Sequence, residues 1–272
     1  MQEIDGYLIK REIPGGGMAS VFVVSKDCMD YALKMPKPGS PEEYVKRFLR
    51  EVRLMERIND DRVLPIIDSN LTGDTPYYIM PLCEDSLDAR IPKMGEAERL
   101  DACIDFARGI YAIHQAGMRH RDIKPANALF LNGELKISDL GLGRFVDRDT
   151  TTMTTTMEAM GTYGFIPLEY FTEPQTFREG TVEGDIFMLG KSIYVICSGG
   201  GNPLFIDSGK VDPSVLSIVQ KCTDIEPDNR YHNVHDIIME LMNIRNAMLK
   251  LQNAPMSLDK ILQNRHLIDF EE

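Results

Sequence analysis

The sequence predicts an α+β fold in two lobes, with a strand-rich first third and a mainly helical remainder. Short apolar stretches predict five strands, and apolar residues at helical spacing predict one helix among them, over residues 42–58. The strands are expected at residues 7–10, 20–24, 31–35, 63–68 and 76–81. Helical spacing then dominates over residues 96–117, 184–198, 213–222 and 233–250. Ligands often bind between two packed lobes, so we expect a cleft there.

These elements divide the chain into four parts. The N-terminal lobe covers residues 1–80 and holds the five-stranded sheet with its helix. Residues 81–85 form a hinge, and the C-terminal helical lobe covers residues 86–250. A tail with a small amphipathic patch covers residues 251–272. The two lobes together make one domain over residues 6–250.

The composition indicates a protein with a substantial core. Of the 272 residues, 43% are hydrophobic, and the net charge is −12. This charge argues against general nucleic-acid or anionic-membrane binding, because affinity for phosphate backbones comes from Lys and Arg. The five cysteines form no Cys-x-x-Cys pair, so neither a zinc site nor a disulfide framework is expected. Neither a secretory leader nor a run of about 18 apolar residues is present, so we expect no membrane segment and a cytoplasmic location.

One stretch, residues 119–127, carries several groups suited to phosphoryl transfer. Asp122 can accept a proton from an attacking hydroxyl, and Lys124 can offset charge on the moving phosphoryl group. Asn127 and Asp139 provide the hard oxygen ligands that Mg²⁺ prefers. The residues between these two predict a pair of short strands joined by an Asn-Gly turn, which would bring both ligands to one metal ion.

Together with Asp139-Leu-Gly, this stretch resembles the catalytic and metal-binding loops of the eukaryotic-type protein kinases. The resemblance implies the bilobal kinase fold, with ATP in the cleft. A degraded form of the kinase Gly-rich loop lies between two predicted strands, where glycines let backbone N–H groups approach phosphate. Gly16 and Val21 match the family pattern and Gly17 adjoins them, whereas Pro14 and Ala19 replace two glycines. The loop is therefore expected to hold ATP less tightly or to be stiffer.

Tyr31-Ala-Leu-Lys34 resembles the strand that carries the phosphate-binding Lys of kinases. The resemblance implies that Lys34 contacts the α and β phosphates and that an acidic residue of the next helix holds it. Glu51 stands at the family's place for this partner, with three other nearby glutamates as rivals. The other residues implied to line the nucleotide site are Val21, Ala32, Met80, Leu82, Cys83 and Leu129, with Gly16 and Gly17.

Later segments extend the resemblance over nearly the whole chain. Residues 161–169 resemble the end of the kinase activation segment. This resemblance implies that Glu169 pairs with Arg230, which comes before the last helices. Asp185 resembles the helix Asp that braces the catalytic loop. Lys124 in its loop, and Thr162 in the loop that would contact the residue after the acceptor, have the form typical of serine/threonine kinases.

The activation segment carries a threonine cluster that is most like bacterial members of the family. The six residues are Thr150, Thr151, Thr152, Thr154, Thr155 and Thr156. The cluster fits a mobile polar loop, and the sharper hypothesis is autophosphorylation. A phosphothreonine adds about −1.5 to −2 charges and needs cationic partners. Arg47, Arg121 and Arg144 stand at family positions for them, and bridging these would turn Glu51 toward Lys34.

Two departures from the family pattern concern substrates. Ala126 stands where many kinases that prefer basic substrates carry Glu, so we expect no preference for basic residues. The turn-rich stretch 198–213 lacks the helix that often docks substrates in kinases, so recruitment is expected to differ.

The chain is thus identified as a member of the eukaryotic-type serine/threonine kinases, with Asp122, Lys124, Asn127 and Asp139 as its catalytic residues. The resemblance implies transfer of the γ-phosphoryl group of ATP to protein substrates, including the chain itself, with Mg²⁺ or Mn²⁺. Two alternatives stay open. The altered Gly-rich loop suggests a pseudokinase-type binding scaffold. A small-molecule phosphotransferase would share the catalytic Asp and the metal ligands.

Overall fold

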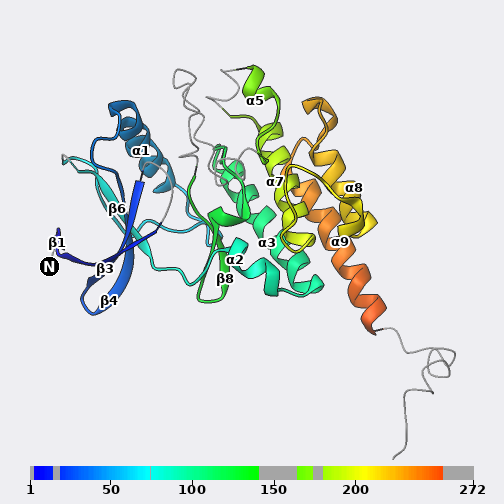
Figure 1. Cartoon of the computed structure of the whole chain (residues 1–272), viewed down its shortest axis with the longest axis horizontal. Coiled ribbons are helices and arrows are strands. Elements are labelled where there is room, and N and C mark those ends of the chain that lie inside the picture. The colour runs from blue at the N-terminus through cyan, green and yellow to red at the C-terminus, as the bar shows by residue number, and fades with distance from the viewer. Residues whose placement is uncertain (1–2, 15–18, 74, 141–163, 174–179, 254–272) are drawn as a thin grey trace, which may run out of the picture.

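A computed structural model of the chain has the two expected lobes, with the larger sheet and α1 (Glu42–Met55) on one side and the long helices on the other (Figure 1). It describes residues 3–14, 19–73, 75–140, 164–173 and 180–253. Within these ranges, the side chains of Arg47, Glu51 and Leu54 are not described.

The N-terminal lobe is an antiparallel sheet with α1 (Glu42–Met55) against one face. Its strands are β1 (Glu3–Ile4), β2 (Tyr7–Ile13), β3 (Ala19–Lys26), β4 (Met29–Pro36), β5 (Asp68–Asn70) and β6 (Tyr77–Pro81). The strand order is β1-β2-β3-β4-β6-β5. The sheet has six strands rather than the expected five, because the two-residue β1 folds back onto β2 and is too short to show an apolar pattern.

The predicted strand at 63–68 was wrong, since β5 begins only at Asp68. Pro65 has no backbone N–H to give to a ladder. The residues just before it pair with the other lobe instead: Leu64 N–H donates to the Ile137 carbonyl at 2.8 Å, and Ile137 N–H donates to the Arg62 carbonyl at 2.8 Å. This segment therefore joins the lobes.

Polar side chains link the two ends of the sheet and so curl it. The Asp5 carboxylate, after β1, accepts hydrogen bonds from Asn70 Nδ2 at 2.9 Å and from the Tyr77 hydroxyl at 2.7 Å. The Tyr7 hydroxyl donates to Asp68 at 3.0 Å. Because β1 and β5 are the outer strands of the order, these bonds close the sheet around its buried side chains.

One face of the sheet carries several of the expected nucleotide-site residues. Strand register sets Val21 opposite Lys34 and Ala32 opposite Met80, and directly opposed side chains in an antiparallel pair lie on one face. Met80 packs with the cluster formed by α1 and β6, so this is the face that α1 covers.

In the C-terminal lobe, α7 packs against α3 and α8, and α9 packs against the same two helices. The apolar residues of α7 are buried on nearly all sides. The α-helices of the lobe are α2 (Leu87–Arg90), α3 (Glu96–Gln115), α5 (Glu169–Thr172), α7 (Val182–Cys197), α8 (Pro213–Cys222) and α9 (Val234–Asn253). Its 3₁₀ helices are η1 (Ile91–Lys93), η2 (Pro125–Asn127), η3 (Ser208–Lys210) and η4 (Pro227–Asn229). Among the helices of the described ranges, none is both long and apolar enough to cross a membrane.

The predicted hairpin between Asn127 and Asp139, the two expected metal ligands, is confirmed. β7 (Ala128–Leu131) and β8 (Glu134–Ile137) pair antiparallel about Asn132 and Gly133, whose φ angles are 54° and 80°. Positive φ at both turn residues is what a tight hairpin requires and what Asn-Gly tolerates. α2 and α5 were not predicted, because four residues are too few to show helical periodicity.

Gly109 of α3 packs closely against Ile137 of β8, which yields a first prediction. A Cβ at this position would lie 2.3 Å from Ile137 Cγ1, and Ile137 is buried and bonded on both sides. We expect Gly109→Ala to destabilise the protein by about 1–2 kcal/mol, because overpacking outweighs the gain in helix propensity. Denaturant unfolding measures this, with Gly73→Ala, whose Cβ would meet little, as control. An equal or greater stability of Gly109→Ala would contradict the packing argument.

Candidate active site

A buried carboxylate organises the loop that leads to Asp122. Asp185 of α7 is fully buried and accepts three hydrogen bonds, each 2.8 Å long. The donors are the His114 ring and the backbone N–H groups of His120 and Arg121. Arg121 has a φ of +66°, a conformation that non-glycine residues adopt only when their surroundings impose it. The bonds to Asp185 supply that constraint.

His120 is held as a neutral ring. Its Nδ1 accepts from the Asp122 N–H at 3.3 Å, and its Nε2 lies 3.1 Å from the Ser138 carbonyl oxygen, which can only accept. The proton is therefore on Nε2. Burial lowers the pKa of His120, which also favours the neutral form. The ring thus connects the backbone before Asp122 to the backbone before Asp139.

Asp122, Lys124 and Asn127 form a tight group after this loop. Lys124 Nζ lies 3.1 and 3.0 Å from the two carboxylate oxygens of Asp122. Asn127 Nδ2 donates to the backbone carbonyl and to Oδ2 of Asp122, both at 2.8 Å. Because both donors of Asn127 are used, its amide oxygen is fixed as an acceptor. The group therefore combines an oriented carboxylate, a cation and a fixed oxygen ligand.

Lys34 and Asp139 join the two lobes by a direct ion pair between Nζ and Oδ1. Burial alone would lower the pKa of Lys34, but the negative charge of Asp139 outweighs it and the pKa is raised. Burial would likewise raise the pKa of Asp139, and the positive charges of Lys34 and Lys124 hold it below its ordinary value. Both groups are therefore charged at neutral pH. Asp139 also has a positive φ, +56°.

The donor set suits a hard divalent cation. Asn127 and Asp139 would supply one amide and one carboxylate oxygen, and Mg²⁺ usually takes only one or two protein ligands beside water and phosphate oxygens. The described residues include no cluster of three His, Cys, Asp or Glu side chains that could hold a metal by themselves. Asn127 and Asp139 therefore fit a cation that is shared with a phosphate.

The described residues that are expected to line the nucleotide site are buried or half-buried. Ala32 is buried, while Val21, Met80, Leu82, Cys83 and Leu129 are half-buried. The hinge runs beside β7, because Glu84 N–H donates to the Phe130 carbonyl at 2.9 Å and Phe130 N–H donates to the Asp85 carbonyl at 2.8 Å. Burial raises the pKa of Cys83 to about 11, so its thiol is protonated.

Glu169 and Arg230 form the ion pair that the sequence implied. Arg230 Nη1 and Nη2 lie 2.5 and 3.1 Å from the two carboxylate oxygens, and Nη1 also donates to the Glu183 carbonyl at 3.1 Å. Arg230 is 2% exposed. A paired, planar contact of this kind fixes α5 against the start of α7.

Comparison with known proteins agrees with this geometry. The sequence matches the protein kinase domain over residues 7–266. The chain belongs to the protein kinase family. Similar curated proteins include a probable serine/threonine-protein kinase of Clostridium acetobutylicum, 26% identical and covering 88% of this chain and 40% of that protein. The serine/threonine-protein kinase PrkC of Bacillus subtilis is 28% identical, over 85% and 39%. PknL of Mycobacterium tuberculosis is 27% identical, over 77% and 54%. The chain therefore spans about half or less of these relatives.

Several residues of the kinase assignment lie outside the described part of the chain. They are Gly16, Gly17, Arg144, Thr162 and the threonines at 150–152 and 154–156. Arg47 and Glu51 are on α1, but their side chains are not described, so the pairing of Glu51 with Lys34 stays a prediction. Arg121 is described, and its side chain packs on Gly180. Asp122, Lys124, Asn127, Asp139 and Lys34 do come together.

One site residue, His114, was not predicted from the sequence. It lies in α3 on the same side as the buried Ile110 and Ile113, and its Nε2 reaches Asp185. The sequence shows His114 only as a polar residue on an otherwise apolar helical face. Histidines at the edge of a protein core give the same pattern, so the pattern does not identify Asp185 as the partner.

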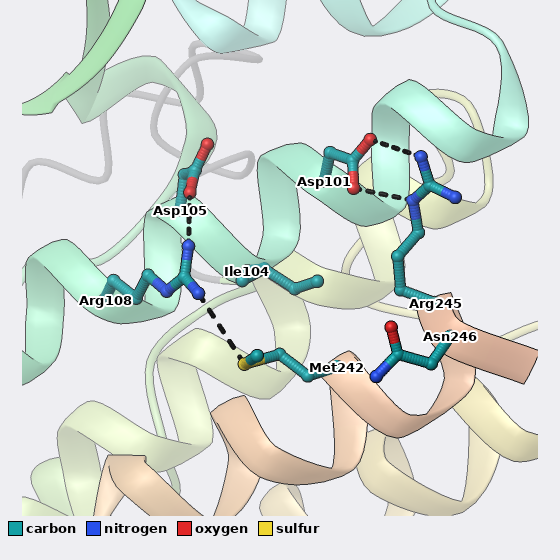
Figure 2. A pocket seen from close by; sticks show the side chains of 7 residues that line it. All are labelled: Asp101, Ile104, Asp105, Arg108, Met242, Arg245 and Asn246. Carbon is teal, nitrogen blue, oxygen red and sulfur yellow. Dashed lines mark hydrogen bonds and ion pairs between the residues drawn. The ribbon is translucent and has the colours of Figure 1, made fainter. Parts of the chain in front are cut away.

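A separate hollow of about 300 Å³ lies between α3 and α9 (Figure 2). Its charged side chains pair with one another: Arg245 with Asp101 at 2.6 and 2.9 Å, and Arg108 with Asp105 at 3.3 Å. Arg108 also reaches the sulfur of Met242. None of these residues is in the kinase assignment, and the pairs join the two helices or brace α3 itself.

The Glu169–Arg230 pair yields a second prediction. Glu169→Ala leaves the guanidinium of Arg230 buried without its counter-charge, and we expect a loss of about 3–5 kcal/mol in the free energy of unfolding. Glu42→Ala is the matched control, because it breaks a solvent-exposed ion pair with Lys46, and exposed pairs contribute little to stability. Chemical denaturation measures both. Similar losses in the free energy of unfolding for the two variants would show that the buried pair contributes no more to stability than the exposed one.

The Lys34–Asp139 pair yields a third prediction. Lys34→Met should raise the pKa of Asp139, because the largest charge that lowers it is removed while burial still disfavours the carboxylate. A lowered folded-state pKa stabilises the protein above the ordinary aspartate pKa, and this stability is lost as the pH falls through the folded value. In Lys34→Met, the free energy of unfolding should therefore no longer show the decrease that this lowered pKa causes as the pH falls. Carbon NMR titration of the Asp139 carboxyl measures the shift, with the exposed pair variant Lys10→Met as control. An unchanged pKa would refute the assignment.

Proposed function

We propose that this protein is an ATP-dependent serine/threonine protein kinase that transfers the γ-phosphoryl group to Ser or Thr hydroxyls. One observation carries the proposal: Asp122, oriented by Lys124 and Asn127, stands in a loop that His120 ties to the Lys34–Asp139 pair. A carboxylate, two cations and a fixed oxygen ligand are the groups that phosphoryl transfer to a hydroxyl needs. The names of the relatives support the serine/threonine specificity.

The roles follow from the contacts. Asp122 would orient the acceptor hydroxyl and take its proton, since its carboxylate is fixed on both sides. Lys124, already beside Asp122, would stabilise the negative charge of the transferring phosphoryl group. Asn127 and Asp139 would hold Mg²⁺, or Mn²⁺, which when bound neutralises phosphate charge. Catalysis would rest on positioning and electrostatics.

Lys34 would hold the α and β phosphates from the sheet side. Its ammonium is kept charged by Asp139. Lys34 lies on the same face of the sheet as Val21, Ala32 and Met80. Glu51 would take over as its counter-charge when α1 turns toward it. Leu82, Cys83 and Leu129 would line the adenine end of the cleft. The boundary between the lobes would then lie at the hinge, residues 81–85.

Regulation by autophosphorylation is part of the same proposal. A phosphate on the 150–156 threonines would bind Arg47, Arg121 and Arg144, and Thr162 would adjoin Asp122 and Lys124. Of these, Arg121 has a described position next to Asp122, and its backbone is fixed by Asp185. A cytoplasmic location fits, since ATP is available there and all five cysteines are free thiols.

The test is intact mass after incubation of phosphatase-treated protein with Mg²⁺-ATP. Wild type should gain phosphate on the 150–156 cluster, and Asp122→Asn should gain none, because the proton acceptor is lost. Asp88→Asn, an exposed carboxylate of α2, is the matched control and should behave as wild type. Phosphate on Asp122→Asn at the wild-type rate would refute the role of Asp122.

Two other outcomes would move the proposal to the alternatives. ATP binding without phosphate transfer to the chain or to added proteins would indicate a binding scaffold. Transfer to a small hydroxylated compound, but to no polypeptide, would indicate a small-molecule phosphotransferase.

A further inference from the structure

Two cysteines that are far apart in the sequence meet between α3 and α7. The Sγ atoms of Cys103 and Cys197 lie 3.6 Å apart, close enough for the thiol of one residue to donate a hydrogen bond to the sulfur of the other. All five cysteines of the chain lie in the described residues and are free thiols. The fold therefore brings two thiols that are 94 residues apart into contact.

Contacts on both sides of the cysteine pair hold the two helices together. Near the start of α3, a Cβ on Gly199 would lie 2.9 Å from Nη2 of Arg99, so this guanidinium packs on the backbone just after α7. At the end of α3, the His114 ring reaches Asp185, near the start of α7, at 2.8 Å. These contacts occur in opposite order along the two helices, which therefore run antiparallel, side by side (Figure 1). The sulfurs are kept close by the packing of both helices.

The end of α7 fixes the backbone at Cys197, the last residue of that helix. Gly199 and Gly200 follow with φ angles of 76° and 101°. The Gly200 N–H donates to the Val195 carbonyl at 2.9 Å, and the Gly199 N–H donates to the Ile196 carbonyl at 3.2 Å. This is the paired bonding of a Schellman motif. Cys197 therefore stands in a defined turn, and its position does not depend on a fraying helix end.

The two sulfurs differ in their access to solvent. Cys103 is fully buried, whereas Cys197 is half-buried. Burial raises the pKa of the Cys103 thiol, which therefore keeps its proton. Two cysteines that serve only as small apolar core residues would both be shielded from reagents. Here one sulfur can meet an oxidant from solvent, and a second sulfur in contact with it can complete the reaction.

We propose that Cys103 and Cys197 form a reversible disulfide when the protein meets hydrogen peroxide. In the first step, the Cys197 sulfur attacks a peroxide oxygen and the O–O bond breaks, which leaves a sulfenic acid and one water that carries the thiol proton. In the second step, the Cys103 sulfur displaces hydroxide from the sulfenic sulfur, and the hydroxide leaves as water with the Cys103 proton. The two thiols lose two electrons, and peroxide is reduced to water.

The disulfide requires a small movement and makes the fold harder to open. A disulfide is about 2.05 Å long, so the two sulfurs must approach by about 1.5 Å. The bond would close a long loop that contains the catalytic loop and the β7–β8 hairpin. Closing such a loop restricts the unfolded chain most, so the oxidised protein should resist unfolding. In a reducing compartment such a bond is transient and responds to oxidants. This inference goes beyond the proposed function and does not depend on it.

The test treats the reduced protein with hydrogen peroxide in small excess, blocks the remaining thiols with iodoacetamide, and maps tryptic peptides without reduction. The expected product links peptide 100–108, which contains Cys103, to peptide 192–210, which contains Cys197. Dithiothreitol should release both peptides. Thiol titration in denaturant should show two fewer free thiols than the five of the reduced protein, and the urea midpoint of unfolding should rise.

Three variants are compared with and without peroxide, so that any loss of stability from the substitution itself cancels. In Cys197→Ser, the buried Cys103 should take up no oxidant, and the urea midpoint should not rise. In Cys103→Ala, the sulfenic acid of Cys197 should persist and react with dimedone. Cys28→Ser removes an exposed thiol that lies elsewhere and should form the same cross-link as wild type. If Cys103→Ala does not fold, wild type and Cys197→Ser still decide.

Several outcomes would overturn the inference. One is a native protein in which peptides 100–108 and 192–210 stay unlinked, whether all cysteines resist peroxide or Cys28 or Cys83 is oxidised instead. Another is a link between these peptides that forms only after the protein has been denatured. A native cross-link that leaves the urea midpoint unchanged would contradict its stabilising effect.

Discussion

The geometry of the site depends on one buried carboxylate, Asp185. An aspartate taken out of water is costly, and the effective penalty in proteins is several kcal/mol unless hydrogen bonds replace the lost hydration. Asp185 has three donors, from the His114 ring and from two consecutive backbone N–H groups. The carboxylate comes from α7 and the imidazole from α3, so the two central helices hold the loop from both sides. The positive φ of Arg121 follows from these bonds, and it determines the direction in which the chain enters Asp122.

The lobes are joined where the chemistry is expected. Lys34, from the sheet, pairs with Asp139 at the end of the hairpin, and the backbone of residues 62–64 bonds to Ile137 just before it. The His120 ring bonds to Ser138, so the same short segment contacts the catalytic loop too. Three consecutive residues, 137–139, therefore contact the N-terminal lobe or the Asp122 loop. A shift of either lobe must move these contacts together, which couples the orientation of the lobes to the geometry of the site.

The sequence predicted those features that depend on local chemistry or on a resemblance. The Asn132–Gly133 hairpin was predictable because its turn needs positive φ at both residues, and α8 because residues 213–222 have apolar residues at helical spacing. The Glu169–Arg230 pair, 61 residues apart, was reached only through the family resemblance. Nothing local predicts that His114 meets Asp185, or that the residues before Pro65 bond to the other lobe. Such contacts depend on how α3, α7 and β8 pack, and periodicity does not contain that information.

The partner of Lys34 shows how two expected functions share one group. A buried ammonium needs a counter-charge, and in the described residues Asp139 provides it, although the resemblance assigns Asp139 to the metal and Glu51 to Lys34. Asp139 cannot fully neutralise Lys34 and bind a metal ion at the same time. Phosphate oxygens on Lys34 would replace the charge of Asp139 and leave its carboxylate available as a ligand; equally, a cation on Asp139 would leave Lys34 available for phosphate. By linkage, each event favours the other. Nucleotide and divalent cation should therefore bind this protein cooperatively, and the part of the coupling that passes through the Lys34–Asp139 pair should be lost when Lys34 is replaced by a neutral residue.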